Sequence, residues 1–202
     1  MTEEHVNAII RYFRIKFCDN KKSGGVIMDW KELLTENYGS AQKVMERALQ
    51  GLTQEDLSWQ PRPDCNSIGW TTWHLTRSLD SIMSSITGKE ELWISEKWHN
   101  KFNRPPDPRD NGYGHSPEQV AALRCPDTDT LLDYHKAVLQ SSKDYLATLS
   151  SADLDRKVDD YMSQFFPTVG SRLIVALDEL LQHAGQVGYI RGLIHGKGWQ
   201  EF

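Results

Sequence analysis

The sequence predicts an all-α protein, a four-helix bundle with a long crossover between its second and third helices. Hydrophobic residues recur at three- and four-residue steps in four separate stretches, and no stretch alternates apolar and polar residues as a strand does. Residues 88–127 lack that period and separate the second stretch from the third. Four amphipathic helices with one long connection are typical of a bundle.

The chain length favours one domain preceded by a short extension. A length of 202 residues fits a single domain with its own core. Residues 1–27 end in the turn-rich stretch 19–25, and the helical pattern begins immediately after Met28. We therefore expect an N-terminal extension at 1–27 and the bundle domain at 28–202.

The first two helices are expected at 29–50 and from Asn66 or Ser67 to about Thr87. Two prolines interrupt the connection between them, and Asn or Ser is a favourable N-cap. The apolar positions of the first helix follow the helical period: Trp30, Leu33, Leu34, Tyr38, Ala41, Val44, Met45, Ala48 and Leu49.

The second half of the chain supplies the crossover and two more helices. Residues 88–127 are expected to be irregular, with a short helical turn that begins at Ser116. The third helix is expected from about Thr128 to Leu149. The fourth follows Pro167 and Gly170 with Ser171 as its N-cap, and ends near Ile194 before two glycines.

The composition argues against two classes of binding partner and against a membrane-spanning segment. A net charge of −5 and a pI near 5.8 argue against a nucleic-acid or anionic-membrane surface. No apolar run approaches the about 20 residues that a membrane span needs. The three cysteines form no CxxC pair, which indicates free thiols and favours a cytoplasmic location.

One histidine of the second helix and a pair of residues on the fourth point to a metal site. Glu179 and His183 are four residues apart, so both side chains lie on one helix face. His74 lies beside a row of small hydroxyl residues, which leaves room for a ligand: Thr71, Ser78, Ser81 and Ser85. Two histidines and one carboxylate suit Zn²⁺ with an open position, or Fe²⁺, with Ni²⁺ or Cu²⁺ as alternatives. The spacing alone does not establish the site, because Glu-x3-His also occurs on ordinary helices.

Two segments resemble the DinB/YfiT-like superfamily of metal-binding four-helix bundles. The segment 68–75 resembles its helix-two motif with the metal histidine at His74, and 178–192 resembles its helix-four signature. Most of that superfamily has three histidines, whereas this chain has Glu179 at the first helix-four position. The resulting His/Glu/His set is similar to that of the mycothiol-dependent maleylpyruvate isomerase branch.

The resemblance implies a metal-dependent enzyme that activates a low-molecular-weight thiol for transfer or isomerisation, with a small electrophile as second substrate. A stress-response protein with a non-catalytic metal is the alternative, and a metal-dependent hydrolase is a third. The seven tryptophans favour burial of a bundle face in a homodimer.

The remaining chemically active residues receive ordinary interpretations. His115 is interpreted as a turn residue, with a lid over the site as the alternative, and Cys65 as an inert thiol. Gln186 and Arg191 either support the ligands or bind an anion, with packing equally open for Arg191. Three further histidines are interpreted as structural or solvent-facing: His99, His135 and His195.

Overall fold

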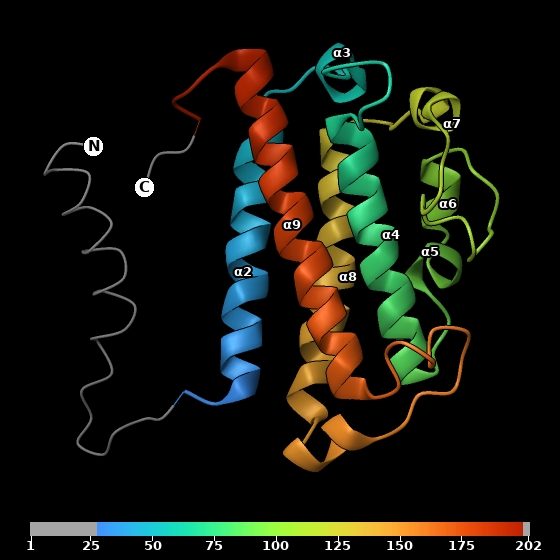
Figure 1. The fold of residues 1–202 in the computed structure, drawn as a ribbon. Helices are drawn as coiled ribbons and strands as arrows, with labels where there is room; N and C mark the ends of the chain where they lie inside the picture. Colours follow the sequence, from blue (N-terminus) through green and yellow to red (C-terminus); the bar gives the residue numbers. More distant parts are fainter. Residues whose placement is uncertain (1–27, 200–202) are drawn as a thin grey trace, which may run out of the picture.

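The computed structural model describes residues 28–199, and four long helices dominate it (Figure 1). They are α2 (Trp30–Leu49), α4 (Ile68–Thr87), α8 (Thr128–Thr148) and α9 (Val169–His195). Helices α8 and α9 each pack against both α2 and α4, so the four surround one core. Helices α2 and α9 run in one direction, and α4 and α8 in the other (Figure 1). The predicted all-α four-helix bundle is confirmed.

Side-chain caps explain where the first two long helices begin and end. The Asp29 side chain accepts a hydrogen bond from the amide of Glu32, which starts α2 in a capping box. The Ser67 side chain accepts a hydrogen bond from the amide of Trp70 at the start of α4, and Gly88 ends that helix in the left-handed conformation. The expected boundaries of both helices are therefore close to the observed ones.

The predicted cap of the last helix is wrong. Thr168, not Ser171, is the N-cap of α9, and Ser171 occupies the third helical position of the same capping box. Thr168 reaches the helix in an extended conformation because it pairs with Lys157 in an isolated antiparallel bridge. Gly170 therefore lies inside the first turn rather than before the helix.

The crossover holds more helix than the sequence predicts. It contains α5 (Leu92–Ser95), α6 (Trp98–Lys101) and α7 (Pro117–Ala122), of which only α7 was expected. The other connections carry α3 (Gln54–Ser58) and η1 (Ser151–Asp155). The crossover covers the outer side of α4 (Figure 1), and α4 is accordingly buried without interruption from Ile68 to Asp80. Side chains of α4 are thus enclosed by the bundle on one side and by the crossover on the other.

Two expectations concern the ends of the chain and its hydropathy. The predicted N-terminal extension, residues 1–27, lies outside the described residues. Within the described part of the chain, no helix has the length and apolarity needed to cross a membrane.

Candidate metal centre

Three side chains from two antiparallel helices converge on one point. His74 comes from α4, and Glu179 and His183 from α9, with all three donor atoms within 4.8 Å of one another. Glu179 Oε2 is 3.2 Å from His183 Nε2 and 3.8 Å from His74 Nε2. Two donors of a tetrahedral zinc ion, each about 2.0–2.1 Å from the metal, are about 3.4 Å apart. The cluster predicted from the sequence is therefore spaced so that it could hold one metal ion.

The second nitrogen of each imidazole already has a hydrogen-bond partner. His74 Nδ1 donates to the backbone oxygen of Asn111 at 2.5 Å, and His183 Nδ1 donates to Gln186 Oε1 at 2.8 Å. An oxygen acceptor requires the proton to be on Nδ1, which leaves the lone pair on Nε2, the atom that faces Glu179. Gln186 thus supports His183, as the sequence suggested.

The charges of the three groups suit a cation. Burial lowers the pKa of His74, which keeps its imidazole neutral as a metal ligand must be. Contact with His183 holds the pKa of Glu179 below its ordinary value. Burial opposes protonation of His183, but its contacts with Glu179 and Gln186 raise its pKa overall. The lowered pKa of Glu179 favours the ionised carboxylate, the form that pairs with a cation.

Glu179 Oε2 supplies the test of whether a metal fits. The atom is buried and accepts no well-directed hydrogen bond, although His183 Nε2 approaches to 3.2 Å. A buried carboxylate oxygen without a directed donor is costly unless something else satisfies it. A divalent cation between this oxygen and the two Nε2 atoms meets that need, so the donor set fits a metal ion.

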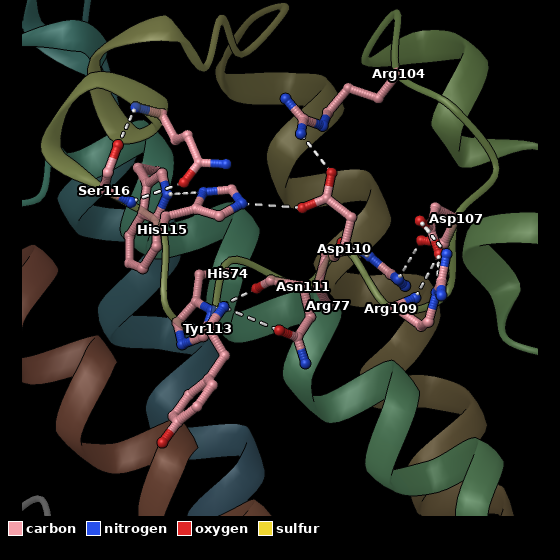
Figure 2. Close-up of polar contacts among 12 residues, drawn as sticks. His74, Arg77, Arg104, Asp107, Arg109, Asp110, Asn111, Tyr113, His115 and Ser116 are labelled. Carbon is pink, nitrogen blue, oxygen red and sulfur yellow. Dashed lines mark hydrogen bonds and ion pairs between the residues drawn. The ribbon is translucent and has the colours of Figure 1, made fainter.

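The crossover reaches His74 through its backbone (Figure 2). Gly112 has φ +94°, and a Cβ on it would lie 2.9 Å from His74 Nδ1 and 2.9 Å from Trp70 Cζ2. Only glycine combines this conformation with so close an approach. On its own helix, the His74 ring stacks on Trp70 with centroids 4.7 Å apart. The imidazole is therefore held between an indole and a turn of the crossover.

His115 follows that turn in the chain and has a larger role than a turn residue. Its backbone amide does donate to Gly112 at 3.1 Å, which closes a turn. Its Nε2 lies 3.0 Å from Asp110 Oδ1, its Nδ1 accepts from Trp70 Nε1 at 3.2 Å, and its ring stacks on Trp73. Because both nitrogens are occupied, His115 anchors the crossover and is not available as a mobile lid over the site.

Two hydroxyls of the row beside His74 are bonded within their own helix. Thr71 Oγ1 donates to the Ser67 carbonyl, and Ser85 Oγ donates to the Ile82 carbonyl. These hydroxyls satisfy themselves on the helix backbone, which accounts for their presence without a ligand.

Other candidates lie away from the cluster. His135 is fully buried with Nδ1 3.0 Å from Thr76 Oγ1, and His195 pairs with Asp56 at 3.1 Å. His99 packs edge-on against Trp93. These contacts agree with structural roles for all three histidines.

Arg191 and Cys65 remain outside the centre as well. Arg191 buries Nε and Nη1 without a hydrogen-bond partner among residues 28–199, which fits its projection onto the apolar side of α9. Cys65 is partly buried just before α4 and carries a free thiol.

The contacts of His74 with the crossover were not predicted from the sequence. Asn111 acts through a backbone carbonyl, which no side-chain pattern reveals. The Asn-Gly pair at 111–112 does signal a turn, and that was the one available hint.

The fold and the cluster define a helical bundle with a candidate His/Glu/His metal centre. Comparison with known proteins gives the family: the DinB superfamily matches residues 38–187, and the chain belongs to it. The crystal structure of a conserved protein from Enterococcus faecalis is similar, with a TM-score of 0.75 and 30% sequence identity over 85% of this chain and 100% of that one. No curated protein gives a significant match. The resemblance read from 68–75 and 178–192 is thus confirmed at the level of the superfamily.

Proposed function

We propose that the protein binds one divalent metal ion through His74, Glu179 and His183 and uses it to activate a low-molecular-weight thiol of the cytoplasm. The thiol would then attack a small electrophile in a transfer or isomerisation reaction. The observation that carries the proposal is the convergence of the three donor atoms, with 3.2 and 3.8 Å between Glu179 Oε2 and the two Nε2 atoms. Zn²⁺ is the first choice of metal, and Ni²⁺ and Fe²⁺ are the alternatives.

Three protein ligands leave a coordination position for a substrate atom. A bound divalent ion supplies Lewis acidity, which lowers the pKa of a thiol at that position. The side chain of Glu179 is 33% exposed, against 9% for His74 and 15% for His183, so solvent reaches the cluster on the Glu179 side. A thiol would enter there, while the crossover closes the His74 side.

The choice of a thiol as substrate rests on the resemblance to the mycothiol-dependent maleylpyruvate isomerase branch. The chain shares with that branch a glutamate between two histidines, and Glu179 lies with both histidines in one cluster. An anionic third ligand reduces the net charge of a Zn²⁺ centre compared with three neutral imidazoles. The thiol pKa at this centre is therefore lowered less than at a three-histidine centre.

Metal analysis followed by a turnover assay tests the proposal. Purified protein should hold about one equivalent of metal and consume a test electrophile only when a thiol is supplied. The panel should contain mycothiol, bacillithiol, glutathione and cysteine. Stoichiometric metal without thiol-dependent turnover would favour a non-catalytic metal-binding stress-response protein, and turnover with water alone would favour a hydrolase.

We also propose a homodimer, on a different basis from the tryptophan count. Trp73 and Trp93 are buried inside the chain and cannot serve an interface. Helix α9 does expose apolar side chains, including Ile174 and Tyr189, each 71% exposed. Light scattering at micromolar concentration should give twice the mass of 23.2 kDa, and a monomer mass would refute this proposal.

A further inference from the structure

A buried arginine on α4 lies one helical turn beyond His74. Arg77 has no exposed surface, and its Nη1 is 2.6 Å from Glu91 Oε2 in the crossover. Its guanidinium also lies 4.7 Å from the centre of the Trp93 ring. Ion pairing and stacking together fix the plane of the guanidinium and leave its other nitrogens directed at the next part of the crossover.

The free donors of Arg77 bind three backbone carbonyls in the crossover; Figure 2 labels Arg77 and two of the residues concerned, Asp107 and Asp110. Nη2 donates to Asp107 O at 3.4 Å and to Pro108 O at 3.2 Å, and Nε donates to Asp110 O at 3.3 Å. The carbonyl that follows these in sequence belongs to Asn111, and it accepts the hydrogen bond from His74 Nδ1. Helix α4 therefore carries both the His74 imidazole and the Arg77 guanidinium, which binds the backbone next to the carbonyl that accepts from His74.

We propose that Arg77 is a positioning residue for the metal centre. By holding the carbonyls of Asp107, Pro108 and Asp110 it places the next part of the chain so that the Asn111 carbonyl accepts from His74 Nδ1, which keeps His74 Nε2 free and directed at the metal. Outer partners of metal-bound histidines set the tautomer and ring orientation of the ligand. Here the outer partner is a backbone carbonyl on a segment without helix or strand structure, so its position depends on what holds that segment. Arg77 supplies the contacts to the backbone itself.

A second set of contacts holds the same segment through a side chain. Asp110 pairs with Arg104 and with His115, which in turn accepts from Trp70. These contacts bind the Asp110 carboxylate and not its backbone carbonyl. The peptide at 110–111 has two hydrogen bonds: its carbonyl accepts from Arg77 Nε at 3.3 Å, and its amide donates to Arg109 O at 3.1 Å within the turn. Of these two, the bond from Arg77 is the one that ties the peptide to α4.

The test is Arg77→Lys, with Arg172→Lys as the matched control. Lysine keeps the positive charge beside Glu91, but its single ammonium cannot reach carbonyls on three residues as the guanidinium fork does. Arg172 is also buried and also binds a carbonyl (Phe166) and a carboxylate (Asp160), yet it lies on α9 eleven residues before His183, about 16 Å along the axis. Both variants lose a buried guanidinium, and only one loses the support of the His74 partner.

Two readouts separate positioning from a general structural role. In the metal-free protein at pH 8, long-range ¹H–¹⁵N NMR of the histidine rings should show His74 with its proton on Nδ1 in the wild type and in R172K, and a mixture of tautomers in R77K. Competition with a chromophoric chelator should show zinc binding weakened about 10–100-fold in R77K and less than 3-fold in R172K. Wild-type tautomer and affinity in R77K, or equal losses in both variants, would overturn the proposal.

The inference rests on the proposed metal centre only for the affinity measurement. If the wild type binds no metal, the proposed function fails, while the tautomer measurement still decides the role of Arg77. Should R77K not fold, the double variant Arg77→Gln with Glu91→Gln removes both charges of this ion pair together. The buried Asp80 carboxylate, 3.8 Å from Arg77 Nη1, keeps its hydrogen bonds from Leu92, Trp93 and Tyr134. The double variant should show the same mixture of tautomers, and a pure Nδ1–H form in that variant would refute the role of Arg77.

Discussion

Glu179→Gln separates the charge of the candidate centre from its shape. The amide has nearly the same volume as the carboxylate, and the side chain is one-third exposed, so packing changes little. The contact that it alters in the metal-free protein is the 3.2 Å approach to His183, and a partly exposed pair of this kind contributes less than about 1 kcal/mol. The metal-free variant should therefore unfold within about 3 °C of the wild type.

The metal-dependent stability should change much more. Zinc at 100 times its Kd stabilises the wild type by about 2.7 kcal/mol, which for a domain of this size raises Tm by about 5–11 °C. A neutral amide oxygen replaces the only anionic ligand of the candidate centre. Loss of a residue that hydrogen-bonds a metal ligand weakens metal binding about 10–100-fold, and we expect a change in a ligand itself to reach at least the upper value, about 100-fold. The same zinc concentration then stabilises the variant by only about 0.4 kcal/mol, which raises Tm by about 1 °C.

Thermal unfolding followed by circular dichroism, with and without zinc, measures both quantities. Asp178→Asn is the matched control, because it makes the same chemical change on the neighbouring exposed residue of α9. D178N should keep the full zinc-dependent shift. A zinc-dependent shift in E179Q equal to that of the wild type would show that Glu179 is not a ligand.

Three further predictions test the ligand, the turn that contacts it and a buried histidine. His74→Ala should abolish zinc binding in a chelator assay while far-UV circular dichroism shows that the helices remain, because the four long helices share a core that does not depend on the metal; retained stoichiometric zinc would contradict the ligand assignment. Gly112→Ala places a Cβ 2.9 Å from His74 Nδ1 and should weaken zinc binding about 10–100-fold. Gly114 has a similar positive φ but open space around it, so Gly114→Ala should leave zinc binding unchanged. Equal losses of zinc affinity in the two variants would implicate backbone strain alone. Burial lowers the pKa of His135 to about 4, below its unfolded value of about 6.5, so the free energy of unfolding is highest above pH 6.5 and falls by about 3 kcal/mol as pH falls to 4. Urea unfolding of His135→Gln should show a smaller loss of stability over this pH range. An unchanged pH dependence in the variant would show that His135 does not cause the loss.

The candidate ligands could be predicted from the sequence in part because a helix imposes its own geometry on the residues that it carries. Glu179 and His183 share a face whatever the tertiary structure, and α9 follows the helical period closely enough for that face to be identified. His74 required the packing of α4 against α9, which periodicity does not specify. The resemblance to the DinB superfamily supplied that pairing, and in the structure the three donor atoms lie within 4.8 Å of one another.

The crossover could not be predicted in the same way. Its short helices, α5 and α6, are four residues each, too short for a hydrophobic period to show. Their positions depend on α4: Asp80 accepts hydrogen bonds from the amides of Leu92 and Trp93, and Arg77 pairs with Glu91. The sequence shows Arg77 and Asp80 as the charged residues of an otherwise uncharged helix, but it does not show which distant groups they bind.

The start of α9 illustrates a smaller error of the same kind. Thr168 and Ser171 are both good N-caps by residue type, and glycine at 170 favoured the later one. The bridge between Thr168 and Lys157 decides in favour of Thr168, and that contact is made by tertiary structure.

The central claim is that one divalent ion is held by His74, Glu179 and His183. The most direct measurement is an anomalous-scattering map from crystals of zinc-loaded protein, together with elemental analysis of the same sample. The account predicts about one zinc per chain and one anomalous peak about 2.0–2.2 Å from His74 Nε2, His183 Nε2 and a Glu179 carboxylate oxygen. An absent peak, or a peak bonded to other side chains, would contradict it.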